Sequence, residues 1–160
     1  METSVLHWLE SSWLGVTTRD VVWMFPTFEI LHFMGLCVLI GSVLVMDLRV
    51  IGLLRAIPMR QALSFTPVAL GAFAVNLASG IGFFCSDPFR YAPNIAFRWK
   101  MLLILVAGLN ALWFWFSRHG KLARLPDSAD ADTVSKVIAA VSLLIWFAVI
   151  VLGRFMPYVE

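Results

Sequence analysis

The sequence predicts an all-α, polytopic membrane protein: a four-transmembrane-helix bundle with an N-terminal interfacial amphipathic segment. Hydrophobic residues make up 61% of the 160 residues, charged residues make up 14%, and the mean hydropathy is +0.87. A soluble domain carries about 25% charged residues. Four apolar runs each approach the roughly 20 residues that a helix needs to cross a bilayer. Their continuity excludes a membrane β-barrel, whose strands alternate between apolar and polar residues.

Residues 1–26 are expected to form the interfacial segment and to lie along the membrane surface. They have no basic leader and no continuous apolar core, which argues against a cleavable signal peptide. Leu6 and Leu9 share one side of a possible helix, opposite Glu10. Three tryptophans are expected at headgroup level, namely Trp8, Trp13 and Trp23. A docking arm in the cytosol is the alternative.

Residues 27–160 are expected to form one bundle, because no repeat, low-complexity tract or second domain interrupts them. Prolines mark the turns between the apolar runs, at Pro58, Pro88, Pro93 and Pro126. The runs place the transmembrane helices at about residues 27–54, 65–85, 98–118 and 134–157. The connection between the third and fourth helices is too short to fold alone.

The basic residues indicate an orientation for the bundle. Seven lie in the first and third loops, and five lie on the opposite side of the membrane. The positive-inside rule therefore places these two loops in the cytoplasm and both termini outside. The net charge of +2 forms no basic stripe on a soluble surface, which argues against a nucleic-acid partner and leaves the lipid bilayer as the expected environment.

Small residues form faces on two of the helices. They are Ala74, Ala78 and Gly82 on the second helix, and Ala107, Gly108 and Ala111 on the third. Small side chains let helix backbones approach closely in lipid. These faces exceed what one four-helix core uses, so we expect a homo-oligomer or a subunit of a larger membrane complex.

Several polar residues within the helices are interpreted as structural. Asn76 and Asn110 both lie near the membrane midplane, where they hydrogen-bond each other or contact a substrate or ion. Asp47 lies at the opposite end of the first helix from Glu29. It is expected to cap the helix or to pair with an arginine at that end, namely Arg49, Arg55 or Arg118.

The most informative polar pair is Glu29 and His32, which lie at i and i+3 on one face of the first helix. A charge within a membrane helix costs about 3 kcal/mol or more, so such residues are functional hypotheses. The same leaflet is expected to hold four cations, Arg90, Arg98, Lys100 and Arg154, together with Asp87. One interpretation is a structural salt bridge from Glu29 to an arginine, Arg154 or Arg98. In the other, His32 ligates a metal or haem or relays protons, and the cations bind the carboxylates of a cofactor or an anionic lipid.

A haem is the cofactor that this set of residues best suits. Zinc or di-iron needs three or more converging ligands, which the outer half of the sequence does not pair into a motif. A b-type haem needs as few as one imidazole, together with cations for its propionates. The hypothesis makes His32 the metal ligand, Glu29 the residue that orients its ring, and the four cations the propionate partners. Candidate second axial ligands are Met24, Met156, His7 or His32 of another protomer.

No nucleophile elbow, phosphate-binding glycine loop or zinc-binding spacing occurs, so an independent enzyme is not expected. Three classes of function remain open. The first is a membrane-embedded cofactor-binding protein, with redox or electron-transfer chemistry, centred on His32. The second is a non-catalytic accessory or scaffold subunit of a membrane complex, in which His32 is structural. The third is a small oligomeric transporter or channel.

Several motifs occur in an order that resembles a known family. They are Glu29-Ile-Leu-His32, Asp47-Leu-Arg49, Asp87-Pro88, Asn94 to Lys100, Ala107 to Ala111 and Gly153-Arg154. The chain is similar over nearly its whole length to a bacterial family of small four-helix integral membrane proteins, catalogued as a domain of unknown function. The resemblance implies a multi-pass, single-domain protein of the bacterial inner (cytoplasmic) membrane, in which the charge bias described above puts both termini on the periplasmic side. It implies no activity.

Overall fold

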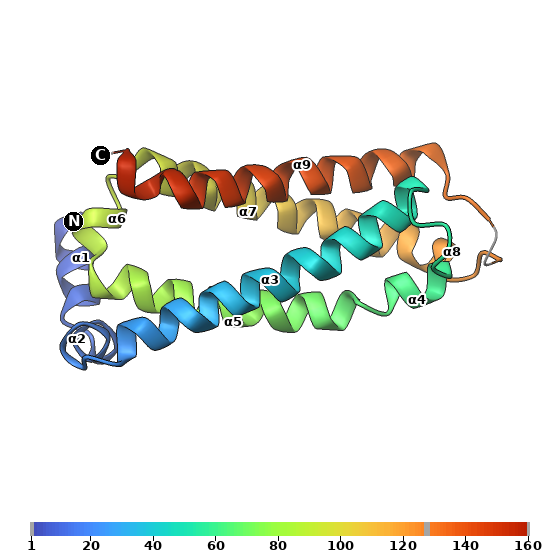
Figure 1. Cartoon of the computed structure of the whole chain (residues 1–160). Coiled ribbons are helices and arrows are strands. Elements are labelled where there is room, and N and C mark those ends of the chain that lie inside the picture. The colour runs from blue at the N-terminus through green and yellow to red at the C-terminus, as the bar shows by residue number, and fades with distance from the viewer. Residues whose placement is uncertain (1, 127–128, 160) are drawn as a thin grey trace.

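The computed structural model describes residues 2–126 and 129–159, and within them every regular element is a helix (Figure 1). The elements in chain order are α1 (Glu2–Glu10), α2 (Trp13–Asp20), α3 (Met24–Ile51), α4 (Met59–Leu63), α5 (Thr66–Ser86), α6 (Pro88–Tyr91), α7 (Ile95–Phe114), the π-helix η1 (Trp115–His119), α8 (Gly120–Leu122), α9 (Thr133–Phe155) and the 3₁₀-helix η2 (Met156–Tyr158). Four helical stretches are long and apolar enough to cross a membrane, namely Met24–Ile51, Met59–Ser86, Ile95–Leu122 and Thr133–Tyr158. The predicted fold class is therefore confirmed.

Local capping decides where two of these helices begin and end. Gly52 has a left-handed backbone, with φ of 102°, and its N–H donates to carbonyls of the last turn of α3. Glycine tolerates this conformation, so α3 ends at Ile51 and not near residue 54. Asn94 caps α7, because its side chain accepts a hydrogen bond from the Phe97 N–H at 3.0 Å. This helix therefore begins at Ile95, three residues before the expected position.

The four long helices form two pairs. α3 lies along α5, α7 lies along α9, and α3 also packs against α9. Figure 1 shows that the two pairs meet at one end of the molecule and separate toward the other, where the chain termini lie. We call these the loop end, marked by residues 52–58, and the terminal end, marked by residues 87–94.

Small residues allow α3 and α5 to approach closely. A Cβ atom at Gly35 would lie 2.7 Å from Asn76 Nδ2, and one at Gly82 would lie 2.6 Å from the Phe28 ring. Neither position has room for a side chain unless its neighbour moves. Ala107 is also buried. The remaining members of the predicted small-residue faces are exposed, namely Ala74, Ala78, Gly108 and Ala111, so much of both faces stays on the surface of the chain.

Buried apolar side chains gather between the loop end and the middle of the bundle. One cluster joins α3, α4, α8 and α9 and consists of Val50, Met59, Leu63, Leu122, Ala131 and Ala139. A second, around Leu39 and Val43, joins α3 and α5 to Trp146 of α9. A third holds α7 to α9 through Ala107, Ile145 and Val149. Among the described residues, none of these clusters joins the two helix pairs at the terminal end.

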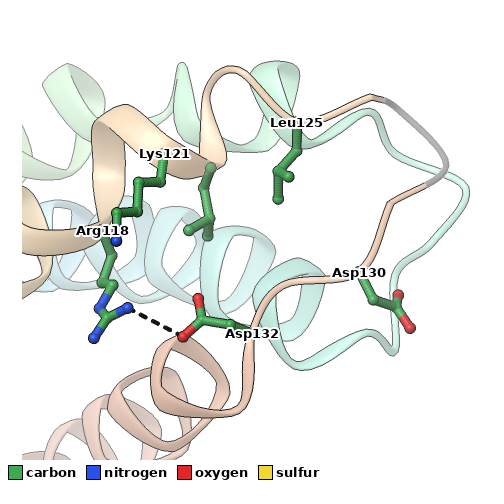
Figure 2. A pocket seen from close by; sticks show the side chains of 6 residues that line it. Arg118, Lys121, Leu125, Asp130 and Asp132 are labelled. Atoms are coloured by element: carbon green, nitrogen blue, oxygen red, sulfur yellow. Dashed lines mark hydrogen bonds and ion pairs between the residues drawn. The ribbon is translucent and has the colours of Figure 1, made fainter.

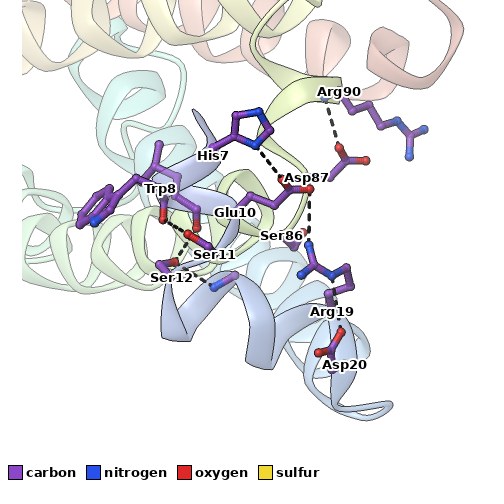
Figure 3. A network of polar contacts seen from close by, with 12 residues as sticks. His7, Trp8, Glu10, Ser11, Ser12, Arg19, Asp20, Ser86, Asp87 and Arg90 are labelled. Carbon is purple, nitrogen blue, oxygen red and sulfur yellow. Dashed lines mark hydrogen bonds and ion pairs between the residues drawn. The ribbon is translucent and has the colours of Figure 1, made fainter. Parts of the chain in front are cut away.

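The N-terminal helices α1 and α2 lie across the terminal end and pack against α5 and α6. The Ser12 hydroxyl begins α2 by accepting a hydrogen bond from the Gly15 N–H at 3.2 Å. A Cβ at Gly15 would lie 2.6 Å from the Cys85 carbonyl oxygen. Figure 3 shows the ion pair that joins Glu10 to Arg19 at 3.6 Å. The predicted interfacial segment is thus docked on the bundle, with its tryptophans exposed: Trp8, Trp13 and Trp23.

Candidate functional site

His32 lies within the membrane-spanning part of α3, about 12 Å from its start at Met24. Its side chain is half-buried and faces α5. Nδ1 lies 2.9 Å from Ser79 Oγ, and the ring meets the Phe83 ring edge-on, with centroids 5.6 Å apart. A Cβ at Gly80 would lie 3.7 Å from His32 Cε1. The imidazole is therefore held in one place against the neighbouring helix.

The Ser79 hydroxyl decides which ring nitrogen carries the proton. It has two carbonyl acceptors on its own helix, Val75 at 2.8 Å and Asn76 at 3.1 Å. A hydroxyl has one proton to donate, and when this proton goes to one of the two carbonyls the Ser79 oxygen accepts the hydrogen bond from His32 Nδ1. In that tautomer the lone pair lies on Nε2, which is the form in which histidine binds a metal. No hydrogen bond to Nε2 is formed by the described part of the chain.

Ser79 has no distinctive signal in the amino-acid sequence. A serine in a transmembrane helix usually donates its hydroxyl to its own backbone and carries no further signal. Its spacing of three residues from Asn76 shows that the two side chains share one face of α5. That spacing was the signal that could have placed Ser79 among the polar residues of the bundle.

Lys100 is the predicted cofactor cation whose charge acts on His32. It lies on α7, about 7.5 Å from the start of that helix. Its half-buried side chain runs along Gly153 of α9, where a Cβ would lie 3.7 Å from the lysine Nζ. None of the ion pairs among the described residues includes Lys100. Lys100 therefore acts on the imidazole electrostatically from the other helix pair.

Glu29 does not take the expected place beside the imidazole. His32 Nδ1 is bonded to Ser79, and the Glu29 side chain is exposed. The alternative salt bridge to Arg98 or Arg154 does not form either, since no ion pair in the described ranges 2–126 and 129–159 includes Glu29. The sequence spacing placed Glu29 near His32 along the helix, but the pairing of α3 with α5 gave the ring a different partner.

Glu29 acts electrostatically on Tyr91 of α6. Burial raises the pKa of the Tyr91 phenol, Arg90 lowers it, and Asp87 and Glu29 raise it further. The phenol is therefore neutral at physiological pH and keeps its proton for hydrogen bonding. Glu29, Tyr91 and Asp87 together form an acidic and aromatic rim at the terminal end.

The three arginines predicted to hold propionates have other contacts at the terminal end. Arg98 Nε donates to the Ala92 carbonyl at 2.9 Å. Arg154 donates to the Tyr158 hydroxyl at 3.2 Å and lies over the same ring. Arg90 lines a cavity of about 220 Å³ with Phe89, Pro93, Asn94, Met156 and Pro157. Of the four predicted cations, Lys100 is the one whose charge acts on His32.

His32 stands alone as a possible imidazole ligand in the membrane-spanning part of α3 that the structure describes. In the described part of the chain, no three His, Cys, Asp or Glu side chains gather where they could hold a metal ion. The His7 ring, a candidate second axial ligand, lies 4.7 Å from the Phe89 ring, and its Nδ1 pairs with Glu10 at 3.7 Å. One imidazole with an available Nε2 is the minimum that haem iron needs from a protein.

Asn76 and Asn110, which were expected to hydrogen-bond each other, have separate partners. Asn76 Nδ2 donates to the Ala72 carbonyl of its own helix at 3.1 Å. Asn110 Nδ2 donates to the Ile138 carbonyl of α9 at 3.2 Å. The physical reason is that α5 and α7 belong to different pairs and do not pack along each other. Asn110 therefore joins α7 to α9, whereas Asn76 lies against Gly35.

Arg49 and Asp47 face different neighbours at the loop end. Arg49 is 1% exposed, and its guanidinium donates to the carbonyls of Ile57 at 2.5 Å and Ala129 at 3.4 Å. Asp47 lies near Ser142 of α9, and its buried Oδ2 has no hydrogen-bond partner among the described residues. Asp47 and Arg49 are two positions apart on α3, so their side chains point about 200° apart around the helix axis. The expected pairing of Asp47 with an arginine does not occur among the ion pairs of the described residues.

The other arginines expected near Asp47 bind aspartates of the third loop. Arg118 lies 3.2 Å from Asp132, and Arg55 lies 2.7 Å from Asp130. Figure 2 shows these aspartates in the wall of a cavity of about 370 Å³, which Arg118, Lys121, Leu122 and Leu125 also line. Both acidic groups are neutralised by cations of the chain, so they hold the loops together at this end.

The fold and the site define a small multi-pass membrane protein that carries an imidazole and an ammonium group inside its bundle. The chain belongs to a family of unknown function (DUF6644), whose model matches residues 5–159. The resemblance inferred from the motifs is thereby confirmed, and the family assigns no activity. No curated protein and no solved structure matches the chain.

Proposed function

We propose that the protein is a membrane-embedded cofactor-binding protein centred on His32, with haem b as its cofactor. The observation that carries the proposal is the 2.9 Å hydrogen bond between His32 Nδ1 and Ser79 Oγ. It holds the ring and leaves Nε2 as the ligating nitrogen. Metal-binding histidines have this arrangement, in which the second nitrogen donates to a neighbouring group.

A cation on the other helix pair supports the same proposal. The charge of Lys100 on α7 acts on His32 of α3, near the end where the Phe84 and Phe97 rings of the two pairs stack at 5.4 Å. Bound haem b supplies one-electron redox chemistry. In this proposal His32 holds the iron through Nε2, Ser79 fixes the ring, and Lys100 balances the charge of an acidic group.

An absorbance spectrum tests this function. Protein produced with ample haem supply should show a Soret band, and His32→Ala should abolish it. Asn110→Ala is the matched control, because it removes a polar bond between α7 and α9 and leaves the imidazole intact. Added imidazole should restore the band in the His32→Ala variant by occupying the vacated ligand position. A colourless, well-folded wild-type protein would contradict the proposal.

The proposal includes a cellular location. The excess of basic residues in the first and third loops supports a bacterial inner-membrane protein with both termini on the periplasmic side. The haem would then lie in the periplasmic half of the membrane, since His32 is near the terminal end of α3. Electron exchange with a periplasmic or membrane partner is the role that fits this depth.

We also propose that the chain assembles as a homo-oligomer or within a larger membrane complex. Ala74, Ala78 and Ala111 are exposed, and nothing lies within 4 Å of a Cβ at Gly108. Native mass spectrometry should show species larger than the 17.9 kDa chain. Ala78→Leu should weaken the assembly, whereas Ala56→Leu at the loop end should not. Monomers alone, unchanged by Ala78→Leu, would exclude assembly through this face.

The same exposed faces favour a second candidate, a non-catalytic accessory or scaffold subunit. In that case the bond between His32 and Ser79 serves to hold α3 against α5. The two candidates differ in the spectrum and in the effect of His32→Ala. A scaffold loses stability or partner binding when His32 is removed, and it has no Soret band to lose.

A further inference from the structure

The cavity at the loop end lies where a membrane helix reaches the end of its apolar span. It has a volume of about 370 Å³ and is lined by Arg118, Lys121, Leu122, Leu125, Asp130 and Asp132 (Figure 2). Arg118 and Lys121 belong to the last turns of the membrane-spanning stretch Ile95–Leu122. Pockets that hold small molecules have volumes of about 300–1,000 Å³, so this cavity is large enough for a polar headgroup.

The helix changes its form directly before this cavity. The stretch Trp115–His119 is the π-helix η1, which joins α7 to α8. Single π-helical turns inside α-helices occur frequently at functional sites. Arg118 lies within η1, and Lys121 follows three residues later in α8. The π-helical turn and the two cations of the cavity wall therefore coincide.

The two cations have donors to offer beyond the contacts that they make with the chain. Arg118 Nη1 donates to Asp132 Oδ2 at 3.2 Å. A guanidinium carries five N–H donors, so Arg118 can bind a second acidic group beside this carboxylate. Asp130 accepts a hydrogen bond from Arg55 at 2.7 Å, and the Lys121 side chain is exposed. The carboxylates of the wall are thus engaged by arginines, and the wall can accept a further anion.

The loop end as a whole carries a surplus of positive charge. Its segments 52–66 and 117–136 contain six lysines and arginines but three aspartates, counting every residue of the sequence. The six are Arg55, Arg60, Arg118, Lys121, Arg124 and Lys136. Three positive charges therefore remain, whichever cations the aspartates pair with. Clustered basic residues beside a membrane helix attract anionic lipids.

Apolar rings on the same helix connect this charge to the membrane. Trp113, Trp115 and Phe116 precede Arg118 within the membrane-spanning stretch, and all three are exposed. Exposed rings in such a stretch contact lipid, and tryptophan is enriched at the level of the headgroups. A ligand that contacts both the cations and these rings has an acidic head and an apolar tail.

We propose that the loop-end cavity binds the headgroup phosphate of an anionic phospholipid. Arg118 and Lys121 contact the phosphate, and the acyl chains lie along the exposed rings of Trp115 and Phe116. The site lies at the opposite end of the bundle from His32, so the proposal does not depend on the binding of haem.

The closing experiment compares two lipids by native mass spectrometry of the full-length protein in detergent. Phosphatidylglycerol and phosphatidylcholine with the same acyl chains share the phosphate group and differ in net charge. The wild type should bind phosphatidylglycerol more tightly. Lys121→Met should weaken this binding about fivefold, the effect of one basic residue at an anionic membrane surface, and should leave binding of phosphatidylcholine unchanged. Lys121→Arg keeps the charge and should keep the affinity.

Arg60→Met is the matched control. It removes the same charge from an exposed position of α4 at the loop end, away from the residues that line the cavity, and it should bind phosphatidylglycerol as the wild type does. An equal loss in Arg60→Met and Lys121→Met would mean general attraction by charge without a site, and it would overturn the proposal. Equal binding of the two lipids by the wild type would overturn it as well.

Inorganic phosphate separates a lipid site from a site for the free anion. Because the acyl chains contribute to binding, excess phosphate should leave phosphatidylglycerol bound to the wild type. Displacement of the lipid by phosphate would show that the cavity takes the free anion, and the assignment to a lipid would be wrong.

Discussion

Both ends of the bundle bury a cation of a transmembrane helix, but they treat it differently. At the loop end the Arg49 guanidinium is 1% exposed and donates to the carbonyls of Ile57 and Ala129. At the terminal end the Lys100 ammonium has no ion pair among the described residues and acts on His32. The backbone supplies the partners of Arg49, whereas Lys100 is half-buried and has no ion pair among the described residues.

The apolar core differs between the two ends in the same way. At the loop end, side chains from α3, α4, α8 and α9 form one buried cluster around Met59 and Leu122. At the terminal end the two helix pairs meet through aromatic rings, because Phe84 of α5 stacks on Phe97 of α7 with centroids 5.4 Å apart. The chain thus joins its helix pairs by a buried apolar cluster at one end and by stacked rings at the other.

The largest expected effect is a loss of stability at the loop end. Arg49→Met leaves the Ile57 and Ala129 carbonyls without their buried donor, so it should lower the free energy of unfolding by about 3 kcal/mol. Lys100→Met should change it by less than about 0.5 kcal/mol, because no described ion pair is lost. Denaturant unfolding in detergent micelles measures both. A loss of stability in Lys100→Met as large as that in Arg49→Met would show that both cations stabilise the folded state to the same extent.

The next effect sharpens the assignment of the terminal end as a site. Ser79→Ala removes the acceptor that holds His32 Nδ1, so haem affinity should fall by roughly tenfold, as it does when groups that support a metal ligand are changed. Ser79→Thr keeps the hydroxyl and should keep the affinity. Spectroscopic titration measures both variants. If Ser79→Ala lowers stability but leaves the affinity and the Soret position unchanged, the bond only fastens α3 to α5.

The smallest effect is a pH dependence at the loop end. The Ser135 hydroxyl bond and the nearby Arg118 hold the pKa of Asp132 below its ordinary value of 3.8. A carboxyl whose pKa is lower in the folded state adds stability above the ordinary pKa, and this contribution is lost as the pH falls through the folded value. Because Asp132 is largely exposed, the loss should stay below about 1 kcal/mol.

Asp132→Asn tests that pH dependence. The variant should lose the extra acid sensitivity below about pH 4, where the wild-type carboxyl takes up its proton. The apparent melting temperature, followed from neutral pH downward, reports the difference between the two proteins. Identical acid sensitivity in both would show that other carboxyls govern the loop end.

Composition and the lengths of the apolar runs were enough to predict the class of protein, its four membrane helices and the position of each polar residue along its helix. These properties follow from the cost of exposing polar groups to hydrocarbon and from the rise of about 1.5 Å per residue along a helix. They place His32 and Lys100 near one end and Asp47 and Arg49 near the other without any knowledge of tertiary contacts. The lengths of the apolar runs did not predict the exact ends of the helices, because capping by Gly52 and Asn94 places these ends a few residues away from the ends of the runs.

The partners of those polar residues were decided only by tertiary structure. Depth along a helix leaves open its rotation and its choice of neighbour, and in lipid these depend on side-chain packing. Because α3 and α5 lie in close contact at Gly35 and Gly82, the His32 side chain faces Ser79 of α5. Separation of α5 from α7 kept Asn76 and Asn110 apart. Sequence spacing therefore predicted the positions of the polar residues along their helices. The pairing of the helices decided which of these residues are in contact.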